Sequence, residues 1–136
     1  DPARGKEISL QQINDGADII YHASGATGAG LFDAAKDQDI FAIGVDSDQG
    51  KLVPDAPILT SVVKRVDNAV YQAISDANDG SFPGGEVIDL GLKEKGLSLA
   101  PFRRFDGDVP QEVKDEVDTA QKGIINGDIK VPDAPQ

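Results

Sequence analysis

The loop from Ser24 to Gly30 has the composition of a ligand-binding turn. It carries three glycines in the pattern Gly-x-x-Gly-x-Gly, beginning at Gly25. Glycine permits positive φ and lets a ligand approach the main chain, and a helix that follows such a loop adds the positive end of its dipole. The dinucleotide fingerprint is Gly-x-Gly-x-x-Gly with an acid about 20 residues later. Here the glycine order is reversed, although Asp46 lies 21 residues after Gly25, and a tight turn without a ligand is the alternative.

Asp46 and Lys64 are the charged side chains that we predict for the same site. A carboxylate at the end of a strand can accept hydrogen bonds from two vicinal sugar hydroxyls, and the alternative is an aspartate that caps a turn together with Asp48 and Gln49. The pattern Asp-x-Asp-x-Gly that begins at Asp46 lacks the later glutamate of a calcium loop, so we predict no metal. Lys64 begins a helix, where an acid is favoured, so a ligand oxygen or a neighbouring aspartate must explain it.

The other residues with reactive side chains have structural interpretations. His22 is the one histidine and stands inside an apolar strand, which favours a role in the core over a role as general base. The pair Arg103 and Arg104 is interpreted as solvated loop charge. No cysteine is present, which excludes a disulfide, a cysteine-ligated zinc and a thiol nucleophile. We predict no catalytic residue and no cofactor.

Strands and helices alternate around these residues. Residues 18–23 and 40–45 are short apolar runs typical of buried strands, and helix formers at 31–36 lie between them. A strand, a helix and a strand with short connections predict a parallel pair. A third strand is predicted at 58–62 and an amphipathic helix at 65–78. In open parallel sheets, ligands bind beyond the carboxyl ends of the strands, and Gly25 and Asp46 follow two of those ends.

The remaining chain predicts further elements of the same α/β class. We expect a short surface helix at 7–13, irregular structure at 50–57 because of two prolines, and a strand at 86–92 because apolar residues alternate there. A short strand is expected at 97–100 and a last helix from Pro110 to Gly127. The fold class is therefore predicted as α/β with a mostly parallel sheet flanked by helices.

The composition excludes several kinds of partner. The chain has 136 residues and a net charge of −11, which argues against nucleic acid and against a bulk anionic membrane surface, because both need clustered Lys and Arg. No apolar run approaches the ~20 residues of a membrane span. The excess of aspartate indicates a high-salt habitat, with ordinary solubility as the alternative. A chain without methionine that starts at Asp1 is expected to be a piece of a longer protein.

Four collinear segments of this chain resemble the basic membrane protein family, which are substrate-binding lipoproteins of ABC importers related to a purine-nucleoside receptor of spirochaetes. The segments are Asp1–Glu7, Gly16–Gly28, Ile43–Gln49 and Leu59–Asp67. Two later segments, Gly91–Gly96 and Gly123–Gly127, also fit. The resemblance covers essentially the whole chain and corresponds to the C-terminal part of the family's two-lobed body.

The resemblance implies a type I periplasmic-binding-protein fold, in which two α/β lobes enclose a ligand and the hinge is crossed three times. It implies that Gly25, Asp46 and Lys64 contact the ribose of a nucleoside with a purine base. This chain has Ala26 where members of the family carry a second glycine. The base-stacking aromatic of the family lies upstream of Asp1, and the base-reading residues lie in the first lobe.

The same resemblance implies the wider organisation. Residues 1–136 are expected to be the C-terminal lobe of an extracytoplasmic binding protein without enzymatic activity, which meets an ABC transporter permease and is held at the membrane by a lipid anchor outside this chain. The chain is expected to cross toward the first lobe near 61–64 and to return near 80–86. The helix at 65–78 would then pack on the missing lobe.

Two alternatives remain open at this point. The glycine loop and Asp46 also fit the dinucleotide-binding half of an NAD-dependent oxidoreductase, and an α/β lobe with no intact site is the third interpretation. If the first lobe is absent, the apolar stripe of Val66, Val70 and Ile74 needs another partner, because an exposed stripe of that length favours association. A dimer of this chain would cover it.

Overall fold

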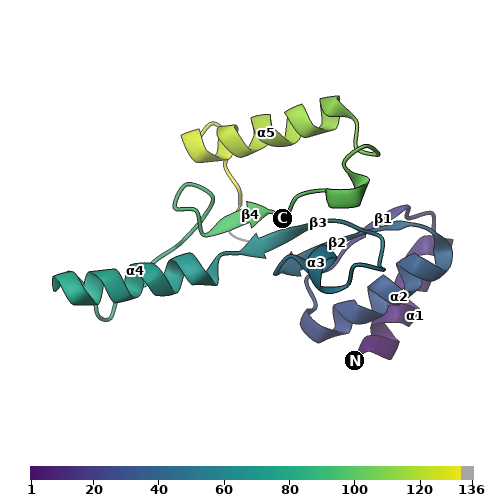
Figure 1. Cartoon of the computed structure of the whole chain (residues 1–136), viewed down its shortest axis with the longest axis horizontal. Coiled ribbons are helices and arrows are strands. Elements are labelled where there is room, and N and C mark those ends of the chain that lie inside the picture. The colour runs from purple at the N-terminus through teal and green to yellow at the C-terminus, as the bar shows by residue number, and fades with distance from the viewer. Residues whose placement is uncertain (133–136) are drawn as a thin grey trace. The chain divides into compact units, whose positions relative to one another are not determined.

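The computed structural model describes residues 1–132 and divides into two compact units. The first unit comprises Asp1–Lys64 and Leu99–Asp106, and the second unit comprises the other described residues. Figure 1 labels the helices and strands of both. All residues predicted for the site belong to the first unit.

Three strands of the sheet are parallel. The order is β1 (Ile19–Tyr21), β2 (Phe41–Asp46), β3 (Ile58–Lys64) and β4 (Leu97–Leu99), and β2 pairs in parallel with both β1 and β3. These positions confirm the predicted strands at 18–23, 40–45, 58–62 and 97–100. The predicted α/β fold with a mostly parallel sheet is confirmed.

The backbone hydrogen bonds show that β4 is antiparallel to β3. The N–H of Ala100 donates to the carbonyl of Ser61, and the N–H of Arg65 donates to the carbonyl of Gly96. Partner numbers therefore fall along one strand as they rise along the other, which is the antiparallel arrangement.

The strand predicted at 86–92 is wrong. The segment has no strand pairing, and the side chain of Val87 is 90% exposed. The chain turns back instead, because the N–H of Gly96 donates to the carbonyl of Gly91, whose own N–H donates to the Glu94 carboxylate. Alternating apolar residues form a strand only where a sheet edge or face receives them.

The helices of the first unit pack closely through small residues. The pair α1 (Pro2–Asn14) and α2 (Ala29–Gln38) lies side by side. The first of these helices is longer than the predicted 7–13 because the Asp1 carboxylate caps its N-terminus and Pro2 occupies its first position. Gly30 of the second helix faces the backbone of Pro2 and Lys6. The core between helices and sheet is made by Ile20, Leu31, Phe32, Ala35, Ala42, Ala56 and Ile58.

The segment 50–57 is not wholly irregular, which corrects the prediction. Residues Gln49–Leu52 form α3, a single helical turn in which the Asp48 carboxylate caps the N–H of Lys51. Pro54 follows this turn, and the proline effect on helix continuation therefore acts one turn later than predicted.

The second unit contains two amphipathic helices, α4 (Val66–Asp79) and α5 (Gln111–Asn126), which end at the positive-φ glycines Gly80 and Gly127. The end of the first helix matches the predicted 65–78. Neither helix buries a residue. Among the described residues of this unit, Val109 is the one buried large hydrophobic side chain. The second unit therefore has almost no core of its own.

None of the helices formed by residues 1–132 is long and apolar enough to cross a membrane. This finding agrees with the absence of a long apolar run in the sequence.

We predict that Gly30→Ala destabilises the first unit. The new Cβ would overlap the carbonyl oxygen of Pro2 and lie 2.5 Å from the backbone nitrogen of Lys6. Overpacking of this kind costs about 1–3 kcal/mol, which exceeds the roughly 1 kcal/mol that alanine gains over glycine in a helix. Urea unfolding of residues 1–136 measures the effect. Gly84→Ala is the matched control, because no atom lies within 4 Å of its Cβ position; equal midpoints for the two variants would contradict the prediction.

Candidate functional site

The carboxyl ends of β2 and β3 bring Asp46 and Lys64 together. Asp46 is the last residue of β2 and Lys64 the last of β3, and the register pairs Asp46 with Val63. The Lys64 Nζ lies 2.7 Å from the Asp46 Oδ1, with 60% and 54% of the two side chains exposed. The hydrogen bond that the Lys64 ammonium donates to this carboxylate raises the pKa of Lys64. Of the two explanations left open for Lys64, the structure therefore shows a neighbouring aspartate.

Asp46 occupies a tight and strained turn. The N–H of Ser47 donates to the carbonyl of Val45 at 2.8 Å, and the residue between them, Asp46, has φ of 69°. A hydrogen bond across one residue with positive φ is the rarer and more strained form of γ-turn. Strain of this kind concentrates at functional sites, where the surrounding structure holds it in place. The residue in this turn is the one that pairs with Lys64.

The three loop glycines have different surroundings. Gly25 begins a short 3-10 turn, η1 (Gly25–Gly28), with φ of 55°, and no atom lies within 4 Å of its Cβ position. A Cβ at Gly28 would overlap the imidazole of His22, and one at Gly30 would overlap α1. Gly25 is therefore the loop glycine whose backbone a ligand could approach, while the other two are small because the protein itself fills the space.

A buried polar cluster lies beneath these residues. The Nε2 of His22 is 3.0 Å from the Oε1 of Gln49, and the same oxygen accepts the N–H of Val45 at 2.8 Å. The backbone N–H of Gln49 donates to the Oγ of Ser61 at 3.2 Å. His22 is buried and meets Phe32 edge to face, as its structural interpretation predicts. Sequence reasoning treated Gln49 only as a turn residue and missed this cluster.

Arg103 and Arg104 are exposed, as predicted, but both have partners that the sequence did not reveal. The Arg103 guanidinium pairs with the Asp48 carboxylate, and Arg104 donates to the carbonyl of Ala56 at 2.8 Å. The guanidinium of Arg104 also lies over the ring of Phe105, which packs edge to face on Phe41. These contacts fasten the segment 99–106 to the first unit.

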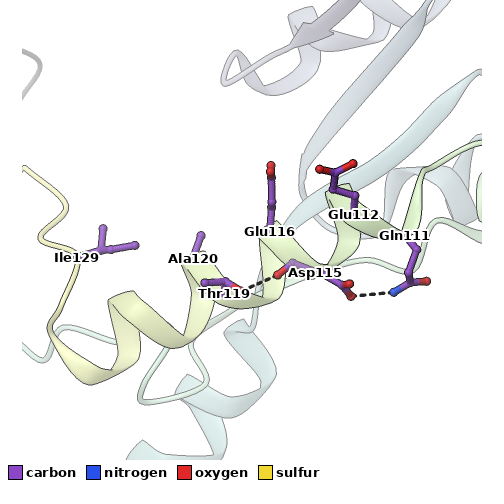
Figure 2. A pocket seen from close by; sticks show the side chains of 7 residues that line it. All are labelled: Gln111, Glu112, Asp115, Glu116, Thr119, Ala120 and Ile129. Atoms are coloured by element: carbon purple, nitrogen blue, oxygen red, sulfur yellow. Dashed lines mark hydrogen bonds between the residues drawn. The ribbon is translucent and has the colours of Figure 1, made fainter.

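The second unit has a shallow depression of its own, which is lined by residues other than those predicted for the site. Figure 2 shows side chains along α5 and from the segment after it. The depression has a volume of about 560 Å³ and is lined by Gln111, Glu112, Asp115, Glu116, Thr119, Ala120 and Ile129. Two of its polar groups serve the helix itself, since Gln111 donates to the Asp115 carboxylate and Thr119 to the Asp115 carbonyl. No residue predicted for the site lies there.

The described residues contain no group of three or more His, Cys, Asp or Glu side chains arranged to hold a metal. The arrangement at the ends of the parallel strands offers a carboxylate acceptor, an ammonium donor and an open backbone segment. Such groups suit a neutral ligand rich in hydroxyls.

Residues 1–134 match the sequence profile of the family described as ABC transporter substrate-binding protein PnrA-like. The chain belongs to this family. The family resemblance read from the sequence motifs is thereby confirmed.

The relatives include proteins of several bacteria. The chain is 35% identical to a CD4+ T-cell-stimulating antigen of Listeria monocytogenes, over 97% of this chain and 40% of that protein. It is 32% identical to the ABC transporter nucleoside-binding protein BmpA of Lactococcus lactis, over 97% and 41%, and 35% identical to basic membrane protein A of Borreliella burgdorferi, over 94% and 38%. The chain thus spans about two-fifths of the length of these relatives.

Two solved structures have the same fold as this chain and are likewise longer than it. An ABC transporter solute-binding protein of Aeropyrum pernix superposes with a TM-score of 0.83 at 29% identity, over 100% of this chain and 46% of that chain. A protein of Bacillus halodurans described as a transcriptional activator of the comK gene superposes with a TM-score of 0.80 at 27% identity, over 92% and 42%. This chain therefore matches somewhat less than half of each structure.

We predict that Asp48→Asn lowers stability at neutral pH but not in acid. Hydrogen bonding to Arg103 lowers the pKa of Asp48 below its ordinary value of 3.8. A depressed folded pKa gives stability that is present above the unfolded value and lost as pH falls through the folded value. Asparagine keeps the helix cap and loses the charge.

Thermal unfolding at about pH 7 and about pH 2 measures the stability of the Asp48→Asn variant against that of the native chain. The melting temperature of the variant should lie below that of the native chain near neutrality and approach it in acid. A difference of the same size at both values would contradict the assignment to the ion pair.

Proposed function

We propose that this chain is the C-terminal portion of a two-lobed, extracytoplasmic binding protein, with its first unit in the ligand-binding C-terminal lobe, and that the protein delivers a nucleoside with a purine base to the permease of an ABC importer. The proposal is one of binding and transport, not of catalysis. The observation that carries it is the Asp46–Lys64 pair, 2.7 Å apart at the ends of two parallel strands, with the open backbone of Gly25 following the neighbouring strand β1. Membership of a substrate-binding family and a relative named as nucleoside-binding support the ligand class.

The chemistry of the three groups suits a ribose. The Asp46 carboxylate accepts from the 2′- and 3′-hydroxyls, and Lys64 donates to sugar oxygens while it neutralises Asp46. The backbone at Gly25 approaches the ring from the neighbouring strand end. Hydroxyls that are buried without partners cost about 1–3 kcal/mol each, so a site that pairs them discriminates for ribose.

The second unit supports the two-lobed arrangement. The chain passes between the units after Lys64, after Ser98 and after Asp106, which fits a hinge crossed three times. The first passage lies at the predicted crossing of 61–64, whereas the predicted return at 80–86 lies inside the second unit. On α4, Val66, Val70 and Ile74 are 63%, 52% and 65% exposed. A helix with such a face needs an apolar surface against it, and the first lobe supplies one.

The dinucleotide alternative gains no support from the loop. A pyrophosphate needs several backbone groups that it can approach closely, and of the three loop glycines only Gly25 is open. No observation favours an oxidoreductase over a binding protein.

We predict that Asp46→Ala weakens nucleoside binding by about thirty- to a thousand-fold, because two hydroxyls and Lys64 lose their partner. Isothermal calorimetry with guanosine, inosine and NAD on the whole gene product measures it. Asp37→Ala is the matched control, because it removes a carboxylate paired to Lys6 at 2.6 Å with 53% of its side chain exposed.

The control should bind as the unaltered protein does. Equal losses for both aspartate variants would mean that the effect is not local to the strand ends. Binding of NAD without binding of nucleosides would overturn the proposed function.

We predict that the apolar face of α4 is covered in the whole gene product. Residues 1–136 contain no cysteine, so the labelling of a Val70→Cys variant beyond that of the unsubstituted protein reports on one position. Its labelling by a maleimide should be fast in residues 1–136 and slow in the longer protein, because the first lobe covers the face. Gln72→Cys is the control on the opposite side of the same helix, where the side chain is exposed, and its labelling should be fast in both.

Fast labelling of Val70→Cys in the longer protein would count against the two-lobed packing. Slow labelling already in residues 1–136, together with a dimer in light scattering, would mean that a second copy covers the face instead.

A further inference from the structure

Gln49 contacts β2 and the residue after β1 through its side chain, and β3 through its backbone N–H. Its Oε1 accepts the N–H of Val45 on β2 at 2.8 Å and lies 3.0 Å from the Nε2 of His22, which directly follows β1. The backbone N–H of Gln49 donates to the Oγ of Ser61 on β3 at 3.2 Å. One residue at the start of α3 thus contacts three neighbouring segments of the sheet.

The hydrogen bonds determine which nitrogen of a neutral His22 ring carries the proton. An N–H can only donate, so the oxygen of the Gln49 amide, and not its nitrogen, must face Val45. The same oxygen cannot donate to His22, so the Nε2 of His22 carries a proton. The Nδ1 is then the acceptor of the neutral ring, and the Ser24 hydroxyl lies 3.4 Å from it. Gln49 therefore selects one tautomer of the imidazole.

Two glycines provide the space for this cluster. A Cβ at Gly44 would lie 2.5 Å from the Oγ of Ser61 and 2.6 Å from the Oε1 of Gln49. A Cβ at Gly28 would overlap the ring of His22. Ser61 is completely buried and His22 is 7% exposed. Ser61 and His22 are thus buried and Gln49 is partly buried, and Gly28 and Gly44 leave room for their side chains.

The cluster lies directly behind the residues of the proposed site. Asp46 follows Val45, Gly25 lies three residues after His22, and Lys64 lies three residues after Ser61. The strained turn at Asp46 stands between two points that Gln49 holds, the N–H of Val45 and its own backbone N–H on Ser61. Strained conformations persist where neighbouring contacts over-determine them.

We propose that Gln49 is a positioning residue for the nucleoside site. It holds the ends of the three strands at fixed spacing, and it thereby presents Asp46, Lys64 and the Gly25 backbone to one ligand without touching that ligand. This role rests on the proposed function of the site.

The positioning role can be tested by measuring the nucleoside affinity of three variants of the whole gene product. Gln49→Met keeps the volume and removes the acceptor, so binding should weaken by about tenfold, the loss of one or two hydrogen bonds behind the site. Gln49→Glu keeps a carbonyl-type acceptor for Val45 and His22 and should stay within about threefold of the unaltered protein. Gln11→Ala, an exposed glutamine on α1, is the control and should have no effect.

A double-mutant cycle separates positioning from a general effect on folding. If Gln49 acts through Asp46, Gln49→Met should have little further effect in an Asp46→Ala background. An equal loss in both backgrounds would overturn the positioning role, as would a Gln49→Met variant that binds as well as the unaltered protein. An unaltered protein that binds no nucleoside would instead overturn the proposed function, and the positioning role with it.

The tautomer of His22 gives a readout that needs no ligand. In residues 1–136 labelled with ¹⁵N, the Nε2 should have the chemical shift of a protonated nitrogen and the Nδ1 that of an unprotonated one. Gln49→Met should let the ring average between tautomers. A native spectrum with the proton on Nδ1 would overturn the arrangement on which the proposal stands.

Discussion

The parallel pairing of β1, β2 and β3 is the constraint on which the candidate site depends. Parallel strands present their carboxyl ends at one edge of a sheet, so residues that are far apart in sequence emerge side by side. Asp46 and Lys64 meet at 2.7 Å for this reason, and Gly25 lies after the neighbouring strand end. Antiparallel pairing would send alternate strand ends to opposite edges and separate the three residues.

Side chains from neighbouring strands can approach one another at that edge of the sheet because glycines leave space for them. Gly44 gives room for the side chains of Gln49 and Ser61, and Gly28 gives room for the ring of His22. The space is then filled by polar groups that pair with one another, as buried polar groups must. No buried side-chain nitrogen or oxygen in the described residues lacks a hydrogen-bond partner.

The two units of the chain differ in what stabilises them. The first unit has a contiguous core between sheet and helices. The second has well-formed helix ends at Gly80 and Gly127 but helices without a buried residue. Helical propensity and caps alone leave helices of this length marginal in water. The first lobe proposed above would give these helices the apolar surface that they lack within this chain.

The local sequence was sufficient to predict those helices and strands whose residue patterns lie within a few positions along the chain. The β-branched runs at β1, β2 and β3, the helical spacing in α4 and the glycines that end the long helices all lie within a few residues of the structure they specify. The order of strand, loop and strand also predicts that Gly25 and Asp46 each follow the carboxyl end of a parallel strand. The four motif segments carried the family, because their residues are collinear along the chain.

Tertiary structure decided the features that depend on distant partners. Residues 86–92 alternate as a strand does, yet they meet no sheet edge and stay irregular. Arg103 has the appearance of loop charge until the fold brings Asp48 beside it, 55 residues earlier in the chain. Lys64 had two explanations, and only the register of β2 against β3 chose between them. Gln49 gave no signal beyond a turn, because its three partners belong to three segments that become neighbours only when the parallel sheet forms.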